Sequence, residues 1–380
     1  MQKSKIKEYY PFLDGLRGIS ILWVLGLHIL LFFDLKSILG SYYWIVYKFF
    51  SIGHLGVDIF FVLSGFLITG LLLDDLSDHV RLKRFYLRRS FKILPQYLLV
   101  VLTGFIFLKL GAFPPIKGAI EINPTLSNQS TLSFILFIQN YIPGSIILMH
   151  TWSLAIEEHF YLLYPVLLIF ICFFTKNIPA RYRCLPIILW ILIIIVNIVR
   201  YYHFAKSPPE ISLLNWGDLI KTFHTHIRAD ALMFGCLIKI YEHQKIFDSF
   251  KNHRVLISSC CVLISLAIYS WFFWKGFSFS SWYAYTLAYI APGLLIIACL
   301  HSFAFLKNIF QNYFYVWVGK NSYAIYLWHS LLIWPFAYLF MKNQSLTWIL
   351  LYILASLLIG MLSTKIIEKY FLDLRNKLVP

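Results

Sequence analysis

The sequence has little charge for its length. Charged residues make up 13% of the 380 residues, hydrophobic residues make up 60%, and the mean hydropathy is +0.72. In a soluble globular domain about a quarter of the residues are charged, and half that share cannot cover a water-facing surface. The composition therefore excludes an ordinary soluble fold, intrinsic disorder and a coiled coil, and it predicts a polytopic membrane protein.

Several motifs of metal-dependent and hydrolytic enzymes are also missing. The six cysteines form no Cys-x-x-Cys pair and no Cys/His spacing that is typical of a metal site. His-Glu-x-x-His is absent, which excludes a zinc protease of that type. Gly-x-Ser-x-Gly is absent too, so a serine hydrolase elbow is not indicated. We expect no metal and no bound cofactor.

Ten apolar segments are long enough to cross a bilayer, because a span needs about 20 apolar residues. They cover residues 12–33, 53–73, 91–110, 152–174, 185–203, 219–240, 255–274, 282–303, 322–341 and 346–367. The run 131–142 is too short to cross and predicts a re-entrant or interfacial piece. We expect an all-α bundle of about ten transmembrane helices that forms a single domain over residues 1–380, with no fused extracytoplasmic domain.

Membrane topology explains the excess of positive charge. Lys and Arg number 33 against 17 Asp and Glu, a net charge of +16. Cytoplasmic loops of membrane proteins collect Lys and Arg. With the N-terminus inside, 22 of these cations fall in cytoplasmic segments and nine in outer segments. The split predicts that both termini are cytoplasmic. Because topology accounts for the positive charge, we expect no nucleic-acid partner.

The first predicted span contains three ionisable residues, Asp14, Arg17 and His28. Such groups cost about 2.5–3.5 kcal/mol each on insertion scales, so each needs a partner or a function. Asp14 and Arg17 are three residues apart and can pair on one helical face. The spacing of Arg17 and His28 returns them to within ~20° of one face and separates them by ~16 Å along the axis. This pattern predicts a stripe from an inner guanidinium to an outer imidazole.

Other predicted spans hold further polar side chains, which are Asp58, Ser64, Glu157, Tyr161, Arg228, Asp230, Tyr323 and His329. Small residues around Ser64 would allow a close helix approach without any further role. Arg228 and Asp230 are only two residues apart, so we expect each to have its own partner on another helix. For these two residues and for His329, inter-helix hydrogen bonding is as good an explanation as function.

A basic cluster follows the second predicted span and comprises Arg81, Lys83, Arg84, Arg88, Arg89 and Lys92. Basic clusters beside a membrane serve topology or bind anionic lipid. Arginine forks and lysine point charges also suit the oxygens of a phosphate-bearing ligand. The residues alone leave both explanations open.

Six stretches, in this order, resemble the acyltransferase 3 family of integral membrane acyltransferases. They are Phe12–Gly18 followed by His28; Gly56–Ile68; Arg88-Arg89 with Pro95; Trp152-Ser153-Leu154 with Glu157 and Tyr161; Arg228-Ala229-Asp230; and Ser322-Tyr323 with Tyr326, Leu327 and His329. The resemblance covers nearly the whole chain. It implies a ten-helix bundle that moves an acyl group, most often acetyl, from cytoplasmic acyl-CoA to a hydroxyl of a carbohydrate-like acceptor.

The resemblance and the residues together suggest roles for the site. We expect His28 to act as the general base for the acceptor hydroxyl, because an unperturbed pKa near 6.5 suits that task. An acyl-imidazole is the less favoured route. Glu157 is expected to orient the imidazole or stabilise its charge. The expected acyl-CoA ligands are Arg17, Arg88, Arg89 and Lys92. The expected supporting residues are Asp14, Asp58, Ser64, Trp152, Ser153, Tyr161, Arg228, Asp230, Tyr323 and His329.

One position departs from the family pattern, which has an arginine where this chain has Lys92. A lysine keeps the charge but loses bidentate geometry. Its assignment to the donor site is weakened accordingly.

The expected acceptor is a cell-surface carbohydrate, such as lipopolysaccharide O-antigen or an exopolysaccharide, or a lipid-linked glycan. The expected location is a bacterial cytoplasmic (inner) membrane, whose lipid is the remaining partner. One alternative is a transporter or flippase of a polar lipid or sugar, with the same charges lining its path. Another is an unrelated membrane O-acyltransferase fold, whose histidine would be expected late in the chain.

Overall fold

The computed structural model describes residues 9–73, 82–113, 116–117, 121–122, 128–142, 146–206, 220–278, 281–301 and 304–378. Within these ranges the chain is almost entirely helical, and one short strand pair joins β1 (Ile116–Lys117) to β2 (Glu121–Ile122). Nine helical stretches in the same ranges are long and apolar enough to cross a membrane. The predicted all-α polytopic membrane fold is confirmed, and the cytoplasmic placement of the termini stays a prediction.

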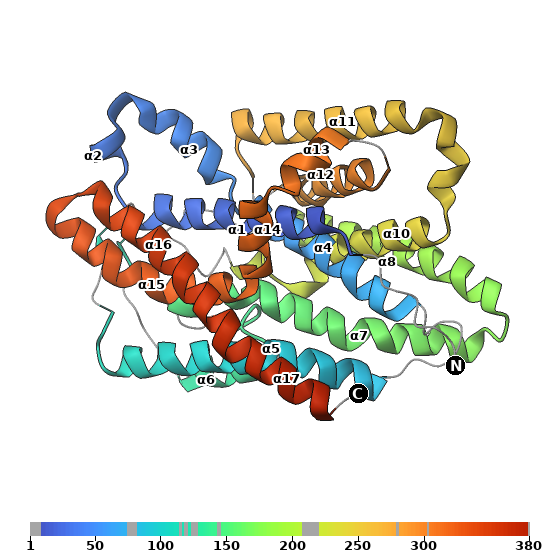
Figure 1. Ribbon diagram of the computed structural model, residues 1–380, viewed down its shortest axis with the longest axis horizontal. Helices are drawn as coiled ribbons and strands as arrows, with labels where there is room; N and C mark the ends of the chain where they lie inside the picture. Colours follow the sequence, from blue (N-terminus) through green and yellow to red (C-terminus); the bar gives the residue numbers. More distant parts are fainter. Residues whose placement is uncertain are drawn as a thin grey trace.

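The long helices follow nine of the predicted spans. They are α1 (Pro11–Phe32), α4 (Leu55–Leu72), α5 (Leu82–Lys109), α7 (Trp152–Phe174), α8 (Ile178–Lys206), α11 (Arg254–Lys275), α12 (Trp282–His301), α15 (Ser322–Asn343) and α16 (Leu346–Ser363). Many of them run along the long axis of the molecule (Figure 1). Their outward faces are apolar: on α8, Ile191, Ile194 and Ile198 are between 50% and 55% exposed. Apolar side chains on that face suit contact with lipid.

Shorter elements connect or extend the long helices. They are α2 (Lys36–Leu39), η1 (Gly40–Tyr42), α3 (Tyr43–Ser51), α6 (Asn128–Ile135), η3 (Ile146–Thr151), η4 (Thr225–Ile227), α10 (Asp230–His243), η5 (Ile246–His253), α13 (Ala304–Phe310), α14 (Tyr313–Lys320), the π-helix η6 (Thr364–Glu368) and α17 (Lys369–Leu378). The run 131–142, predicted not to cross, contains the end of the eight-residue helix α6 and the turns after it.

The predicted span 219–240 is the one that differs. Its helix, α10, begins only at Asp230 and has 14 residues, a length of about 21 Å, whereas the hydrocarbon core is about 30 Å thick. The residues before it form turns and η4. Arg228 and Asp230 each pair with another helix, which accounts for a helix start at this point.

Glycines let α4 and α10 cross at backbone contact. A Cβ atom added to Gly65 would stand 1.9 Å from the carbonyl oxygen of Leu232, and one added to Gly235 would stand 2.0 Å from that of Val62. No side chain fits at either position. The small residues predicted to allow close packing around Ser64 do so, and they fix the part of α4 that carries Ser64.

Glycines also allow a close crossing of α1 and α14. A Cβ atom added to Gly319 would stand 1.7 Å from the carbonyl oxygen of Asp14, and one added to Gly18 would stand 2.1 Å from that of Tyr315. The crossing therefore holds the segment of α1 around Asp14 directly against the C-terminal end of α14.

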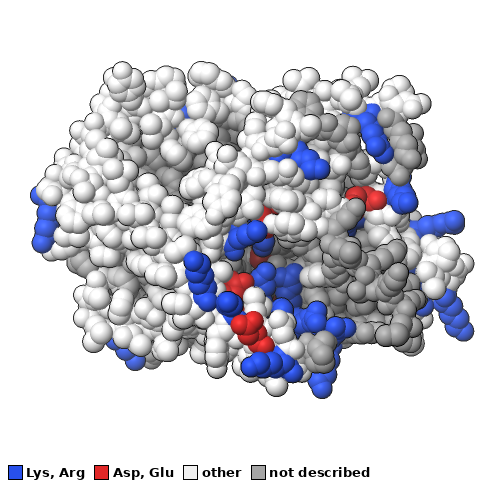
Figure 2. All heavy atoms as spheres, viewed as in Figure 1, with Lys and Arg blue, Asp and Glu red and all other residues white. Residues whose placement is uncertain are grey.

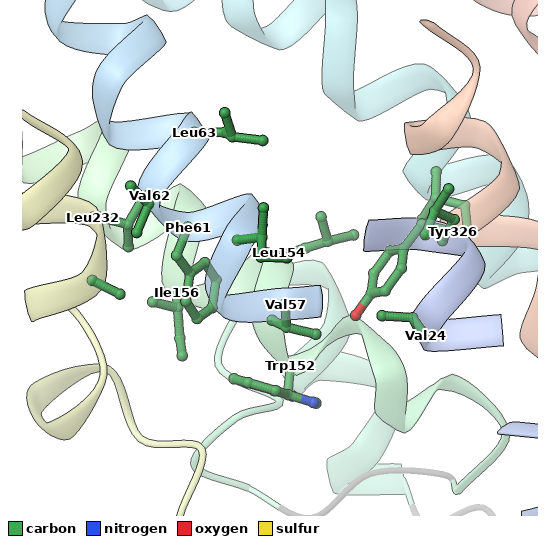
Figure 3. Packing of buried hydrophobic residues seen from close by; sticks show 14 of the residues in the cluster. Val24, Val57, Phe61, Val62, Leu63, Trp152, Leu154, Ile156, Leu232 and Tyr326 are labelled. Carbon is green, nitrogen blue, oxygen red and sulfur yellow. The ribbon is translucent and has the colours of Figure 1, made fainter. Parts of the chain in front are cut away.

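Helix α4 lies in the hydrophobic core and packs against α1, α7, α10 and α12. In Figure 3, Phe61 and Val57 on α4 lie near Trp152, at the start of α7, and the hydroxyl of Tyr326 points in from α15 toward the same region. Phe61 is fully buried, and its ring lies 6.0 Å from that of Trp152, edge to face. This packing places Tyr326 where α4, α7 and α15 meet.

Candidate active site

A cavity lies between α1, α4, α5, α7, α14 and α15. Among the described residues that line it are seven Arg, Lys and Glu side chains, which are Arg17, Arg89, Lys92, Lys320, Glu157, Glu158 and Glu368. Figure 2 shows cations and acids side by side in a hollow near the centre of a face that is otherwise mostly uncharged. Charges inside an apolar bundle cost free energy unless a partner or a ligand compensates them, so this cavity is the candidate active site.

Arg17 reaches the cavity from α1. Its Nη1 atom lies 3.6 Å from Oδ1 of Asp14, which is the pair that the sequence spacing predicts. Gly319 and Lys320, at the end of α14, line the cavity beside it. The glycine crossing of α1 and α14 therefore positions one cation from each helix at the same cavity.

Helix α5 contributes two of its predicted cations to the cavity. Arg89 and Lys92 are three residues apart and share a helical face, whereas Arg88 is rotated from Arg89 by about 100° and is not part of the lining. The guanidinium carbon of Arg89 lies 4.8 Å from the ring centroid of Tyr161, a cation–π contact. Arg88 is exposed, as are Lys83 and Arg84 before it.

Glu157 is tied to α4 and to its own helix. Its Oε1 atom accepts a hydrogen bond from Ser64 at 2.8 Å, and its Oε2 atom accepts one from Tyr161 at 3.0 Å. Each oxygen thus accepts one hydrogen bond, and among the described residues no hydrogen bond joins Glu157 to His28. The geometry places Glu157 in the cavity, and its expected role of orienting the imidazole or stabilising its charge stays a prediction.

His28 belongs to a group of three imidazoles that lies outside the cavity lining. Its ring centroid is 4.8 Å from that of His329, which is 4.9 Å from that of His150. The Nδ1 atom of His28 lies 2.9 Å from the carbonyl oxygen of Val24. Because a carbonyl can only accept, this contact puts the proton of a neutral His28 on Nδ1 and leaves the Nε2 lone pair free to take another.

His329 is held in the same way from α15. It is fully buried, and its Nδ1 atom lies 2.6 Å from the carbonyl oxygen of Tyr326. The Tyr326 ring lines the cavity and lies 5.5 Å from that of His329 and 5.3 Å from that of His150. Tyr326 and His329 thus connect the cavity to His28, which does not line it.

Comparison with known proteins decides the family. The family model for an acyltransferase domain, that of acyltransferase 3, matches residues 10–365. The chain belongs to the acyltransferase 3 family. The resemblance predicted from the six sequence stretches is confirmed.

Curated relatives of this family member carry related names. It is 29% identical over 350 residues to "Putative O-acetyltransferase" of Staphylococcus aureus strain COL, covering 86% of this chain and 51% of the relative. It is 27% identical over 392 residues to peptidoglycan O-acetyltransferase OatA of Listeria monocytogenes, covering 95% of this chain and 56% of the relative. The chain thus spans about half the length of the curated relatives it matches. No solved structure matches it significantly.

Two buried ion pairs lie apart from the cavity. Nη2 of Arg228 lies 3.0 Å from Oδ1 of Asp58, and Arg200 pairs with Asp230 through a charge-assisted hydrogen bond. The prediction that Arg228 and Asp230 have separate partners on other helices is confirmed. None of the four residues lines the cavity, so their direct contribution is to join α4, α8 and α10.

Of the remaining predicted supporting residues, Tyr323 and Ser153 line the cavity and Trp152 does not. Tyr323 lines it and donates its hydroxyl to a backbone carbonyl of α5 at 2.8 Å. The hydroxyl of Ser153 lies 2.8 Å from that of Tyr326. Trp152 stacks on Phe223, with ring centroids 4.2 Å apart and an interplanar angle of 8°.

Five residues at the site were not selected from the sequence, which are His150, Glu158, Lys320, Tyr326 and Glu368. Glu158 follows Glu157 directly, and Tyr326 belongs to a stretch that carried the family resemblance, so both had a signal. Glu368 had none, because it lies after the last predicted span and enters the cavity from the π-helix η6.

Proposed function

We propose that this protein is a membrane O-acetyltransferase that moves an acetyl group from cytoplasmic acyl-CoA to a hydroxyl of a cell-surface carbohydrate. The observation that carries the proposal is one cavity with cations at Arg17, Arg89 and Lys92. A lining residue of that cavity, Tyr326, contacts the imidazole group that contains His28. Family membership supports acyl transfer as the reaction class, and the names of the relatives favour acetyl as the acyl group.

Acyl-CoA has a polyanionic nucleotide end and an uncharged pantetheine arm that ends in the thioester. The exposed cations at the start of α5, Lys83, Arg84 and Arg88, suit the phosphates. The arm would then follow the cavity past Arg89 toward Tyr326. The thioester would meet the acceptor hydroxyl near Tyr326, on the side that faces His329.

In the proposed reaction, Nε2 of His28 removes the hydroxyl proton of the acceptor as its oxygen attacks the thioester carbonyl carbon. The new C–O bond forms, the C–S bond breaks, and the imidazolium returns the proton to the departing thiolate. The products are the acetyl ester and free CoA, so the step consumes and releases no net proton. The Nδ1 contact of His28 with Val24 supports this role, because it leaves Nε2 unprotonated.

The acceptor is proposed only as a class. Two relatives, OatA and the Bacillus subtilis protein named "Putative peptidoglycan O-acetyltransferase YrhL", carry peptidoglycan in their names. Those names favour an N-acetylated glycan of the peptidoglycan type over lipopolysaccharide O-antigen. Both remain hydroxyl-bearing carbohydrates that would be reached from the outer face of the membrane.

The test uses the full chain in lipid nanodiscs with acetyl-labelled acetyl-CoA. Peptidoglycan fragments, O-antigen oligosaccharide and an exopolysaccharide fragment are offered separately, and mass spectrometry detects the gain of one acetyl group per ester formed. We expect ester on at least one glycan, and none with His28→Ala. An intact protein that leaves the label on CoA with every glycan, or that moves a glycan across the membrane without labelling it, would refute the proposal and favour a transporter.

A further inference from the structure

The acids of the cavity are unexpected in a site for a polyanion. A site made only for phosphate would consist of cations and N–H donors. Here three carboxylates, those of Glu157, Glu158 and Glu368, stand among four cations. Carboxylates repel phosphate and accept hydrogen bonds from N–H and O–H groups, so this part of the cavity suits a ligand segment that is uncharged and rich in donors.

Glu158 makes no hydrogen bond or ion pair within the described part of the chain. Glu157 beside it accepts hydrogen bonds from Ser64 and Tyr161. Glu158 lines the cavity without a hydrogen bond or ion pair to any described residue. A carboxylate placed in a bundle without a donor loses the hydration that it has in water. Water or a ligand inside the cavity must therefore supply its hydrogen bonds.

Glu368 enters the cavity through a local change of helix type. The π-helix η6 adds one residue to the turn between α16 and α17, which changes the direction of Glu368 relative to a regular α-helix. Nε2 of the buried Gln96 lies 3.4 Å from one of its oxygens. Glu368 lies beyond residues 10–365, so the family match does not account for it.

We propose that Glu158 and Glu368 form a second recognition element of the donor cavity, which accepts hydrogen bonds from the amide N–H and hydroxyl groups of the pantetheine arm. The inference rests on the proposed function, because it assumes a CoA thioester as donor. Arg17, Arg89 and Lys92 then balance the two carboxylates, and the phosphates remain with the exposed cations of α5. The cavity selects the donor by its arm as well as by its charge.

The experiment compares two donors, acetyl-CoA and S-acetylpantetheine, which share the arm and differ in the nucleotide. The apparent KM and kcat of each donor are measured in nanodiscs at a fixed glycan concentration for the wild type, Glu158→Met, Glu158→Gln and Glu368→Gln. We expect Glu158→Met to raise the KM of both donors by about tenfold, the loss expected for a hydrogen bond to a charged acceptor, with little change in kcat. Glu158→Gln keeps an acceptor oxygen, so its KM values should lie between those of the wild type and those of Glu158→Met. Glu368→Gln should raise both KM values by less than Glu158→Met does.

Two controls separate recognition from folding and from charge. Arg88→Gln should raise the KM of acetyl-CoA and leave that of S-acetylpantetheine unchanged. Asp34→Asn removes one exposed carboxylate just after the end of α1 and should change neither KM. Each variant must elute from size exclusion as the wild type does before its kinetics are read.

The outcomes that overturn the inference are specific. A KM for S-acetylpantetheine that is unchanged or lowered in both Glu158→Met and Glu368→Gln would show that the carboxylates do not bind the arm. A raised KM for acetyl-CoA alone would show that the two carboxylates contact the nucleotide and not the arm. A folded wild type that uses neither donor would instead refute the proposed function, which distinguishes the two failures.

Discussion

The cavity and the buried ion pairs contain the same kinds of side chain in opposite arrangements. At the ion pairs, Asp58 meets Arg228 and Asp230 meets Arg200, and each pair is almost completely buried. In the cavity, cations and acids line an open space, and Glu158 makes no hydrogen bond or ion pair to a described residue. The ion pairs are closed contacts between helices, whereas the cavity leaves its charges available to a ligand.

The difference shows how a charge inside a membrane protein can be interpreted. The cost of burying it is similar in both regions, so the cost alone does not reveal function. A charge that is matched within the fold stabilises helix packing, and a charge that faces a cavity unmatched indicates a substrate. Substitutions at the ion pairs should therefore change stability, and substitutions at the cavity should change donor binding or catalysis.

Replacing His28 by Gln should have the largest effect. A general base contributes about 10²–10⁴-fold to rate, so acetyl transfer should fall by that factor while acetyl-CoA binding stays within about twofold. Transfer is measured by mass spectrometry of the glycan, and binding by isothermal titration. His159→Gln is the matched control, since His159 contacts Thr225 and does not line the cavity. Full transfer by a folded His28→Gln variant would remove the proposed base.

Replacing Asp230 by Ala should break an ion pair without touching the cavity. Arg200 would be left buried without its carboxylate, and removal of one partner of a buried pair costs about 3–5 kcal/mol. We expect a large fall in thermal stability in detergent and an unchanged donor KM in the folded fraction. A changed KM with intact stability would contradict the division between the two regions.

Replacing Gly319 by Ala should lower stability and weaken donor binding together. The added Cβ would meet the backbone of α1 beside Asp14, and overpacking of this kind costs about 1–3 kcal/mol. Because Arg17 lies one turn away from the contact, the donor KM should rise along with the loss of stability. Scanning fluorimetry and donor kinetics on the same sample check this, and a loss of stability alone would show that the crossing does not position Arg17.

Replacing Arg89 by Lys should change donor binding more than stability. Lysine keeps the charge but loses the planar group that lies over Tyr161 and can bind bidentately. We expect the KM of acetyl-CoA to rise by up to about tenfold with kcat nearly unchanged. Arg89→Met, which also removes the charge, should have the larger effect. A KM that is unchanged in Arg89→Lys and raised in Arg89→Met would assign Arg89 a purely electrostatic role.

The smallest effect is expected from pH at His224, which lies between α8 and α10, outside the nine candidate spans. Burial, with nearby His226, His203 and Lys221, lowers its pKa from 6.5 to about 4. Between these two pH values the unfolded chain binds more protons at His224 than the folded chain does. The free energy of unfolding is therefore unaffected by His224 above pH 6.5, and it falls as the pH drops toward 4. Thermal midpoints measured from pH 7 to pH 4.5 should decline less steeply in His224→Gln than in the wild type. Identical slopes would contradict the assignment.

Much of the bundle could be predicted because long apolar runs have one stable solution in lipid. Helices satisfy their own backbone hydrogen bonds, so each 20-residue run predicts a span without knowledge of its neighbours. The exception, 219–240, failed because its polar residues bond to other helices. Local spacing also predicted the pair of Asp14 and Arg17, since three residues along a helix are always neighbours.

The site was less predictable because its members come from six helices and a π-turn. The spacing on α1 pointed to Arg17 and His28, but no local pattern shows that Glu157 bonds to Ser64 and not to His28. Nor does one reveal that Glu368 returns to the cavity after the last span. Such contacts depend on which helices cross and at what distance.

The sequence by itself determined that this chain is a helical membrane protein of the acyltransferase 3 family, because composition and local motifs act through neighbouring residues. Only the tertiary structure decided which intramembrane charges neutralise one another and which face an open cavity. That choice depends on close helix crossings, such as the one at Gly65, where a displacement of a few ångströms makes or breaks a contact. Electrostatic and hydrogen-bonding partners are set by distance in space, which separation along the chain does not specify.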